Sequence, residues 1–270
     1  MVTQAIIPLA GLGTRLLPLS SVIPKELLPI NGKPNLEYIL DECLQAGIKQ
    51  FIFVVPRNRP SIKKYFFNDN FYKKILKKKK DQRIAKEFKK IKKYQKMIKF
   101  VYQNKPEGTG DAVLKCQNII KGKFFLMLLP DDLIIKNNCS KEMIKLHSKT
   151  KGSIIATKRV SRNSVSRWGI LSVQHRKRNY FQIKDVIEKP SIKKAPSNFA
   201  IIGRYILSSK IFNEIKKLKP GQGGELHITD AIKNLINKDD KFYGNIFKGT
   251  YLDCGTLQGY INSGLRINKR

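Results

Sequence analysis

The amino-terminal part of the chain is an apolar segment that runs directly into a glycine-containing turn. Residues 4–9 have the length and composition of a buried β-strand, and residues 10–15 follow as Ala-Gly-Leu-Gly-Thr-Arg. Glycines let a backbone approach a ligand closely, and N–H groups at the start of the next helix can face an anion. This order predicts an α/β fold whose first loop contacts phosphate.

The alternation of strand and helix patterns continues after this loop. An amphipathic helix pattern over 35–46 ends at Gly47, and a strand pattern over 51–55 follows it. Further strand patterns lie at 98–102, 124–129 and 153–157, with helical patterns near 111–119 and 141–147. Such alternation predicts a Rossmann-like mixed, mainly parallel sheet flanked by helices.

A lysine-rich stretch interrupts the alternation. Between Lys73 and Lys99 there are fourteen Lys or Arg residues and two acidic residues, yet Ile84, Phe88 and Ile91 keep roughly helical spacing. We therefore predict a solvated amphipathic helix, forming a helical excursion near 71–97 rather than a disordered loop.

The length and apolar content suit one large domain. The chain has 270 residues and is 41% hydrophobic, so we expect a single domain over 1–270. Its first half, about 1–135, contains the glycine turn and the lysine-rich excursion. Its second half, about 136–270, ends in a helix and has strand patterns at 168–173, 180–188 and 199–207. This higher strand content predicts a smaller β-rich subdomain packed on the first half.

The composition argues against several classes of protein. The longest apolar run is far shorter than the roughly 20 residues of a membrane span, and the segment before the first strand lacks the charged region of a signal peptide, so we expect neither. The four cysteines are widely separated, which predicts neither disulfides nor a zinc site and favours a cytoplasmic protein. The net charge of +34 has two readings, attraction to nucleic acid or a lysine bias of the whole sequence. Because no aromatic-plus-basic recognition motif accompanies the charge, we do not expect nucleic acid as a partner.

The first loop is a phosphate-binding candidate of a less common type. Arg15 supplies a planar charge for bidentate contact with phosphate. A dinucleotide fingerprint needs a third glycine where this chain has Leu16, and the Gly-Lys-Ser/Thr end of a Walker loop is absent. Two common cofactor classes are thus excluded, and an ordinary tight turn remains the alternative for this motif alone.

An acidic pair follows the apolar segment at 124–129. Asp131 and Asp132 come where that strand is expected to end, which is the sheet edge at which ligands bind in open α/β folds. Carboxylate oxygens suit Mg²⁺ that bridges phosphate oxygens. Asp131 is therefore the first candidate metal ligand, with a turn-forming aspartate as the alternative.

Several further segments, taken in order, resemble one known family over residues 4 to about 260. They are Gly11-Leu12-Gly13-Thr14-Arg15, Pro24-Lys25-Glu26-Leu27-Leu28-Pro29, Gln103 with Gly108-Thr109-Gly110-Asp111-Ala112, Glu188-Lys189-Pro190 and Leu252-Asp253-Cys254-Gly255-Thr256. Together they resemble the signature of the sugar-1-phosphate nucleotidyltransferases. The glutamate after Lys25 is similar to that of bacterial UTP–glucose-1-phosphate uridylyltransferases in particular.

The resemblance implies the nucleotide-diphospho-sugar transferase fold, Mg²⁺ as cofactor and a set of site residues. The implied catalytic residues are Arg15, Lys25 and Lys189. The implied nucleotide-binding residues are Leu9, Ala10, Gly11, Gly13, Glu26, Gln103, Gly108 and Asp132. The implied sugar-binding residues are Gly169, Glu188 and Lys189, and the implied metal ligands are Asp131 and Asp253.

The implied reaction is in-line attack of glucose 1-phosphate on the α-phosphorus of UTP, which yields UDP-glucose and pyrophosphate. Such a displacement needs alignment and charge neutralisation more than a nucleophilic side chain. The expected partners are these two small molecules and other copies of the chain in a dimer or tetramer, without a membrane.

Three alternatives remain open from the sequence. The same chemistry with dTTP or another hexose 1-phosphate would be separated by comparing nucleotide turnover. A basic nucleic-acid-binding protein on this fold would show salt-sensitive RNA binding without pyrophosphate release. A catalytically weak regulatory paralogue is disfavoured because Arg15, Lys25, Asp131 and Lys189 are all present.

Overall fold

The computed structural model describes residues 1–268 of the chain. The strands are β1 (Gln4–Pro8), β2 (Pro29–Ile30), β3 (Lys33–Pro34), β4 (Gln50–Val55), β5 (Ile98–Tyr102), β6 (Phe124–Leu128), β7 (Asp132–Ile135), β8 (Ser153–Arg159), β9 (Gly169–Gln174), β10 (Tyr180–Glu188), β11 (Phe199–Ser208), β12 (Phe242–Ile246) and β13 (Thr250–Asp253). The α-helices are α1 (Asn35–Gln45), α2 (Ser61–Phe67), α3 (Asp69–Lys78), α4 (Gln82–Gln95), α5 (Gly108–Leu114), α6 (Cys139–Thr150), α7 (Ile211–Ile215), α8 (Ile228–Ile236) and α9 (Leu257–Asn268). Short 3₁₀ helices are η1 (Thr14–Leu16), η2 (Leu19–Ser21), η3 (Lys25–Leu27), η4 (Arg162–Arg167) and η5 (Gln222–Gly224).

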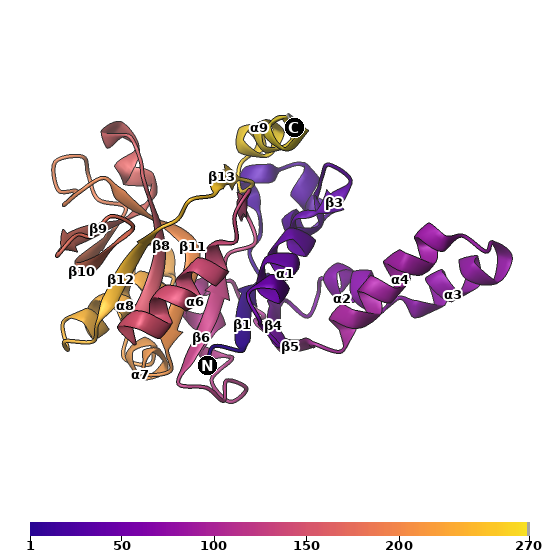
Figure 1. The fold of residues 1–270 in the computed structure, drawn as a ribbon, viewed down its shortest axis with the longest axis horizontal. Coiled ribbons are helices and arrows are strands. Elements are labelled where there is room, and N and C mark those ends of the chain that lie inside the picture. Colours follow the sequence, from indigo (N-terminus) through magenta and orange to yellow (C-terminus); the bar gives the residue numbers. More distant parts are fainter. Residues whose placement is uncertain (269–270) are drawn as a thin grey trace.

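One nine-stranded mixed sheet runs through the molecule, in the order β5-β4-β1-β6-β11-β8-β12-β10-β9 (Figure 1). The first four strands are parallel, as the strand–helix alternation predicts. From β6 onward the pairings are antiparallel except for β8 with β12. The expectation of a mainly parallel sheet therefore holds for the first half only. Hydrophobic periodicity identifies a buried strand but carries no information on its direction, which explains the difference.

The strands of the second half continue the same sheet instead of forming a separate one. Strand β11 lies between β6 and β8, and near Ala200 it also pairs with β9. The β11–β8 register shifts between Ile201 and Tyr205, and this irregularity bends β11. The first part of β11 can therefore pair with β9, while its second part pairs with β6. The smaller β-rich subdomain expected from the sequence is thus the antiparallel end of a shared sheet.

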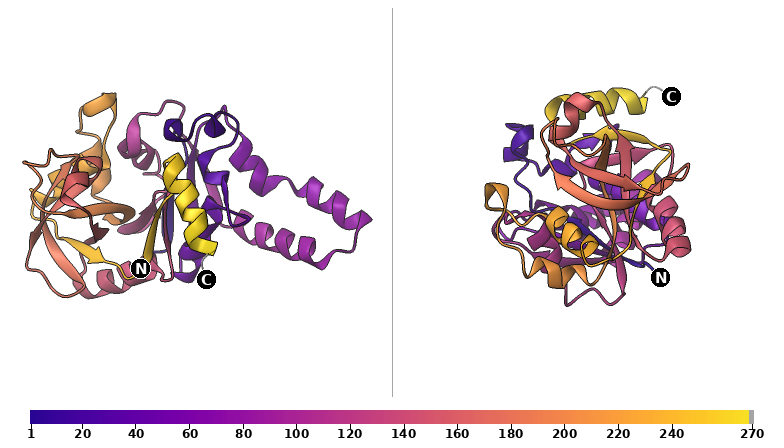
Figure 2. Two further views of the ribbon diagram at one scale, coloured as in Figure 1. Left: turned by 90° about the horizontal axis from the view of Figure 1, so that it is seen from above. Right: turned by 90° about the vertical axis from the view of Figure 1, so that its left-hand side faces the viewer.

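Helices cover both faces of the sheet (Figures 1 and 2). On one face α1 and α6 bury side chains such as Leu36, Leu40 and Met143 in the larger apolar core. On the other face α5, α7 and α8 bury Ala112, Phe212 and Ile232 with residues of the sheet. None of the described helices combines the length and apolar character that a membrane span requires.

The lysine-rich segment forms two helices rather than one. Helices α3 and α4 pack side by side and extend away from the sheet (Figures 1 and 2). The chain turns at residues 79–81, where the Asp81 side chain accepts hydrogen bonds from the N–H groups of Arg83 and Ile84 and caps α4. The rings of Tyr72 and Phe88 stack between the helices with centroids 5.1 Å apart. The sequence contains a signal for this break that the prediction of one helix did not use, because no apolar residue lies between Leu76 and Ile84 and the helical apolar spacing therefore stops before the turn.

Helix α5 begins earlier than the pattern near 111–119 predicts. It starts at Gly108, and the N–H of Gly110 donates to the carbonyl of Leu226 over 2.7 Å. A Cβ atom at Gly110 would lie 2.7 Å from that same carbonyl oxygen. Close packing against the segment before α8 thus overrides the poor helix propensity of the two glycines.

Candidate functional site

The glycine loop after β1 wraps around one lysine side chain. Gly13 has φ of 68°, a left-handed conformation that favours glycine, and its carbonyl accepts a hydrogen bond from the Ser20 hydroxyl over 2.8 Å. A Cβ atom at Gly13 would lie 3.1 Å from Cβ of Ser20 and 3.6 Å from the Lys25 side chain. The glycine therefore lets the loop close over Lys25, which lies in η3.

Lys25 reaches the acidic residue at the end of β6. Its Nζ lies 2.7 Å from Oδ2 of Asp131, and Arg15 lies 3.8 Å from the same oxygen. Burial lowers the pKa of Lys25, but attraction to Asp131 and Glu26 outweighs it, so the pKa is raised. Burial raises the pKa of Asp131, and the Lys25 charge and hydrogen bond more than offset this, so it is lowered. Both side chains are therefore held in their charged forms.

A cavity of 480 Å³ lies between this loop and α5; we call it the glycine-loop cavity. Its size suits a nucleotide-sized ligand. Gly108 has φ of 96° there, and a Cβ atom on it would lie 2.6 Å from the Leu226 carbonyl oxygen. Predicted site residues on its wall are Ala10, Gly11, Gly13, Arg15, Lys25, Gln103, Gly108 and Asp131.

A second cavity of 670 Å³ lies beside the first; we call it the Glu188 cavity. The N–H of Lys189 donates to the Trp168 carbonyl over 3.0 Å, which joins the end of β10 to the start of β9. Lys189 Nζ lies 4.0 Å from Oε1 of Glu188 and is half-exposed, so both groups remain accessible. Predicted site residues on this wall are Arg15, Asp131, Asp132, Gly169, Glu188, Lys189 and Asp253.

The two cavities meet at a common boundary. The shared lining residues are Thr14, Arg15, Leu129, Asp131 and Glu225. Residues from the first loop, the centre of the chain and the Glu188–Lys189 segment therefore surround one continuous cleft. This arrangement can hold two anionic groups, one on each side of Asp131.

Three predicted nucleotide-binding residues lie elsewhere than on the glycine-loop cavity. Asp132 lines the Glu188 cavity, where its carboxylate accepts hydrogen bonds from the Gly203 N–H and the Tyr251 hydroxyl. Burial and the neighbouring Asp131 raise the pKa of Asp132 to about 6. Leu9 and Glu26 are buried below the surface and line neither cavity.

Glu26 is an unusual buried acid next to Lys25. Its side chain is 2% exposed, and its Oε1 atom has no hydrogen-bond partner in the part of the chain that the structure describes. Burial raises the pKa of Glu26 to about 7, against the attraction of Lys25. From this position its charge helps to raise the pKa of Lys25, and its side chain does not line the cavity.

The two predicted metal ligands lie close to each other. The Gly255 N–H donates to Oδ1 of Asp253 over 2.9 Å, and a Cβ atom on Gly255 would lie 2.9 Å from Oδ2 of Asp131. Within residues 1–268 there is no cluster of three or more side chains of the types that bind metals. Mg²⁺ in nucleotide sites commonly takes one or two carboxylates together with substrate phosphates. The pair of carboxylates fits this ligand set.

Sequence reasoning missed several residues that line the cleft. Arg167 lies 3.8 Å from Asp253, and the Tyr251 hydroxyl donates to Asp132. Arg167 lies two residues before Gly169, an implied sugar-binding residue, and Tyr251 directly precedes the segment Leu252-Asp253-Cys254-Gly255-Thr256. Nearness to these positions was the available signal for both residues. The remaining missed lining residues include Thr14, Thr109, Tyr205 and Glu225.

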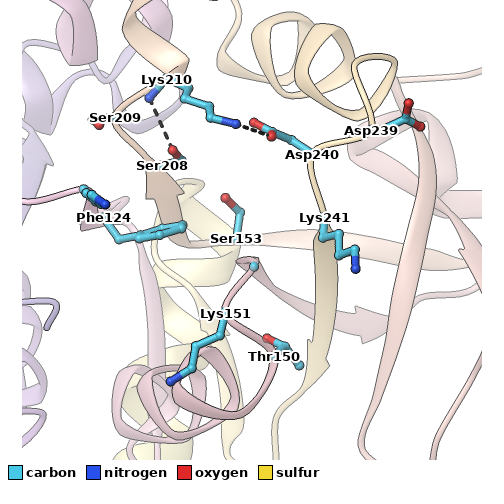
Figure 3. Close-up of a pocket in the computed structure, with 12 residues that line it drawn as sticks. Phe124, Thr150, Lys151, Ser153, Ser208, Ser209, Lys210, Asp239, Asp240 and Lys241 are labelled. Carbon is cyan, nitrogen blue, oxygen red and sulfur yellow. Dashed lines mark hydrogen bonds and ion pairs between the residues drawn. The ribbon is translucent and has the colours of Figure 1, made fainter.

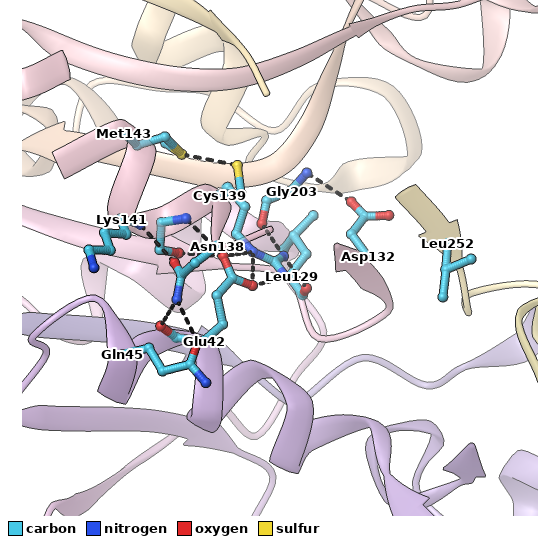
Figure 4. A network of polar contacts seen from close by, with 12 residues as sticks. Glu42, Gln45, Leu129, Asp132, Asn138, Cys139, Lys141, Met143, Gly203 and Leu252 are labelled. Carbon is cyan, nitrogen blue, oxygen red and sulfur yellow. Dashed lines mark hydrogen bonds and ion pairs between the residues drawn. The ribbon is translucent and has the colours of Figure 1, made fainter. Parts of the chain in front are cut away.

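A buried ion pair supports the loop that contains Asp131 (Figure 4). The Arg204 side chain is fully buried and donates to both carboxylate oxygens of Glu42, at 3.3 and 3.1 Å from Nε and 2.9 Å from Nη2. Its Nη1 also donates to the carbonyls of Leu129 and Gly203. Arg204 thus ties α1 and β11 to the end of β6.

A further cavity of 600 Å³ lies among the loops that include Gly152 and Ser209, and it contains none of the described site candidates. Lys210 forms an ion pair of 2.6 Å with Asp240 on its rim. Figure 3 shows the Lys151 and Lys241 side chains pointing away from Ser153 instead of converging. This cavity lacks the convergent polar groups of the cleft.

Comparisons with known proteins show which family this chain resembles over its length. The family model described as nucleotidyl transferase matches residues 4–270. A putative UTP–glucose-1-phosphate uridylyltransferase of Methanocaldococcus jannaschii is 34% identical over 267 residues, which are 99% of this chain and 93% of that protein. A UTP–glucose-1-phosphate uridylyltransferase of Mycoplasma pneumoniae is 34% identical over 270 residues, covering 98% and 91%.

Solved structures give the same result. The structure of a UDP-glucose pyrophosphorylase complexed with UDP-glucose matches with a TM-score of 0.88 and 34% identity, covering 100% of this chain and 99% of that one. A UTP-bound enzyme of the same kind from Acinetobacter baumannii matches with a TM-score of 0.88 and 31% identity, covering 99% and 93%. The shared fold and full-length similarity lead to one conclusion. This chain belongs to the nucleotidyl transferase family.

Proposed function

We propose that this chain transfers a uridylyl group from UTP to glucose 1-phosphate, giving UDP-glucose and pyrophosphate. One observation carries the proposal: two cavities meet at Arg15 and Asp131 in a chain 34% identical, over nearly its full length, to uridylyltransferases. The junction is where a nucleoside triphosphate in one cavity would meet a sugar phosphate in the other.

The nucleotide occupies the glycine-loop cavity in this proposal. The backbone of Gly11 and Gly13 approaches the phosphates, and Arg15 adds positive charge at the boundary between the cavities. Lys25 lies beside this loop and contributes a second cation. Their role is to stabilise the negative charge of the departing pyrophosphate.

Glucose 1-phosphate occupies the Glu188 cavity in this proposal. Glu188 accepts hydrogen bonds from sugar hydroxyls, with Gly169 leaving room beside it, since a Cβ atom there would lie 3.1 Å from Oε2 of Glu188. Lys189 aligns the sugar phosphate. A phosphate oxygen then attacks the α-phosphorus of UTP, forming the new O–P bond as the bond to pyrophosphate breaks.

Mg²⁺ would be held by Asp131 and Asp253 together with phosphate oxygens of the substrate. When bound, it neutralises phosphate charge during the displacement. Asp131 would hold the ion from the boundary of the cavities and Asp253 from the Glu188 cavity, and Arg167 lies 3.8 Å from the second carboxylate.

Pyrophosphate release, measured in a coupled assay, tests the proposal. We expect turnover with UTP and glucose 1-phosphate, loss of turnover with EDTA and recovery with added Mg²⁺. Lys189→Ala is expected to lower kcat about 100-fold with a small change in the KM for UTP, because it removes the alignment of the second substrate. The matched control is Lys184→Ala, which changes an exposed lysine outside the cleft in β10, the strand that directly precedes Lys189.

A panel of dTTP, other nucleotides and other hexose phosphates distinguishes the alternatives. Turnover with dTTP above that with UTP would reassign the nucleotide. No pyrophosphate release with any pair of substrates would reject the proposed activity, and an unchanged rate in Lys189→Ala at saturation would remove that residue from it.

A further inference from the structure

The amide of Gln103 is held in one orientation by a carboxylate. Gln103 lies after β5, lines the glycine-loop cavity and is 4% exposed. Its Nε2 donates to Oδ2 of Asp111 over 2.7 Å and to the carbonyl oxygen of Gly108 over 3.2 Å. Both amide hydrogens are therefore used within the protein.

The opposite orientation of this amide is excluded by charge. A flip would place Oε1 of Gln103 against a carboxylate oxygen and a carbonyl oxygen, and three acceptors without a hydrogen cannot bond. In a buried site an unsatisfied acceptor next to a negative charge is strongly unfavourable. Oε1 is consequently the only polar atom of this amide that has no protein partner among the described residues, and it functions only as an acceptor.

Asp111 is itself fixed in place. It is 6% exposed in the first turn of α5, and its second oxygen, Oδ1, lies 2.9 Å from Nζ of Lys115 one turn later. The main-chain N–H of Gln103 donates to the carbonyl of Val55 over 3.0 Å, which fixes the backbone on the other side. The Gln103–Asp111 contact therefore joins two rigid elements of the cavity wall.

We propose that Asp111 is a positioning residue that sets the base preference of the site by locking Gln103 as a hydrogen-bond acceptor. This inference rests on the proposed function, in which the nucleotide base occupies the glycine-loop cavity. Uracil presents an N3–H donor between two carbonyl oxygens, which matches a fixed acceptor. Cytosine presents an unprotonated N3 at that place, and two acceptors would face each other.

The fixed orientation of Gln103 discriminates between some bases and not others. Thymine has the same donor and acceptor edge as uracil, so Gln103 and Asp111 do not separate UTP from dTTP. They separate both from CTP. The chemical class selected is thus a pyrimidine with a hydrogen on N3.

Asp111→Asn tests the lock because an asparagine amide can donate or accept. In this variant the asparagine NH₂ group can donate to Oε1 of a turned Gln103, so only the Gly108 carbonyl still opposes the turn. The NH₂ group of Gln103 can then face the cavity and bond the N3 atom of cytosine. We expect the ratio of kcat/KM for UTP to that for CTP to fall about tenfold or more, with a smaller loss for UTP itself. A uniform structural defect would lower both values and leave the ratio unchanged.

Two further variants complete the experiment. Lys115→Met removes the partner of Asp111 but keeps the Gln103–Asp111 bond, so the UTP-to-CTP ratio is expected to stay as in the wild type. In the double variant Gln103→Glu/Asp111→Asn the asparagine donates to the new carboxylate, and the carboxylate presents an obligate acceptor to the base, at the cost of the bond to the Gly108 carbonyl. It is expected to restore the preference for UTP over the single variant.

Affinities for UTP and CTP from titration calorimetry, with melting temperatures as a check on folding, separate this inference from the proposed reaction. If the wild type binds UTP well above CTP but releases no pyrophosphate, the proposed function fails while the lock can still be tested. A folded Asp111→Asn protein that keeps the wild-type selectivity would overturn the inference. So would a double variant no more selective than Asp111→Asn.

Discussion

Breaking the buried ion pair between Glu42 and Arg204 should destabilise the protein more than removing both partners. Arg204 is 0% exposed and Glu42 is 8% exposed, so neither charge has water as an alternative partner. Burial lowers the pKa of Arg204, but the charge and hydrogen bonds of Glu42 more than compensate and raise it. In the variant Glu42→Leu the guanidinium therefore stays charged and loses its counter-ion.

The expected cost follows from the contacts that each variant leaves unmade. An uncompensated buried charge costs about 3–5 kcal/mol, so Glu42→Leu should lower the free energy of unfolding by that amount. The double variant Glu42→Leu/Arg204→Met has no buried charge at this place. Both variants leave the Ser140 hydroxyl and N–H without Glu42. The double variant also leaves the Leu129 carbonyl without its bond from Arg204, which costs roughly 1–3 kcal/mol, whereas the Gly203 carbonyl keeps its bond from the Leu129 N–H. Because this cost is smaller than that of an unpaired buried charge, the double variant should be more stable than Glu42→Leu.

Urea unfolding of the wild type, Glu42→Leu, Arg204→Met and the double variant measures the coupling free energy between Glu42 and Arg204. Trp168 is the single tryptophan and packs against Tyr251, so its fluorescence reports on the cleft. We also expect the double variant to show a kcat lowered about 10- to 100-fold, because the carbonyl of Leu129 anchors the turn that leads to Asp131. A double variant that is no more stable than Glu42→Leu would show that the unpaired charge is not the source of the loss. Full activity in the folded double variant would refute the anchoring role.

Two other predictions concern the neighbourhood of Lys25 and the lysine-rich helices. Because burial raises the pKa of Glu26 from 4.5 to about 7, the folded protein keeps a proton that the unfolded chain has released. Its contribution to the free energy of unfolding is complete below about pH 4.5 and is lost as the pH rises through 7, a decline of about 3 kcal/mol. Glu26→Gln should abolish this decline. Parallel profiles of unfolding free energy against pH for the two proteins would contradict the prediction. Limited trypsin digestion should cut first in the exposed turn at Lys79 and Lys80, between α3 and α4, and leave pyrophosphate release intact. Earlier cleavage in one of the strands β1, β4, β5 or β6 would show that these two helices are not the least protected part of the fold.

The first half of the fold is predictable because its pattern is local. The apolar runs of β1, β4 and β6 each fill one buried parallel strand, β5 forms the partly exposed parallel edge, and the glycine loop follows β1 directly in sequence. The break between α3 and α4 also has a local signal, which the prediction of one helix did not use: no apolar residue lies between Leu76 and Ile84, and Asp81 is a favourable N-cap residue. The antiparallel placement of β11 next to β6 is a long-range pairing that no local period encodes.

The residues of the cleft could be predicted from the sequence only where they belong to a motif. Arg15, Lys25 and Lys189 stand in recognisable segments, and all three line the cleft. Asp132 stands in one too, but the sequence does not tell which cavity the second of two adjacent aspartates faces. Tyr251 enters through the pairing of β13 with β7, which sets it opposite Ile134 and brings its hydroxyl to Asp132. Such contacts depend on tertiary pairing and lie outside the reach of motif reasoning.

The pairing of Lys25 with Asp131 has a consequence for how the cleft accepts its substrates. Both side chains are mostly buried, at 16% and 14% exposed, so each charge needs a partner before any ligand arrives. With the protein alone, the two satisfy each other over 2.7 Å. Under the proposed roles, a magnesium-bound triphosphate would supply an anion for Lys25 and a cation for Asp131 at once. Such an exchange would leave neither buried charge unpaired, which gives a physical reason for a lysine and an aspartate to stand in contact beside the boundary of the two cavities.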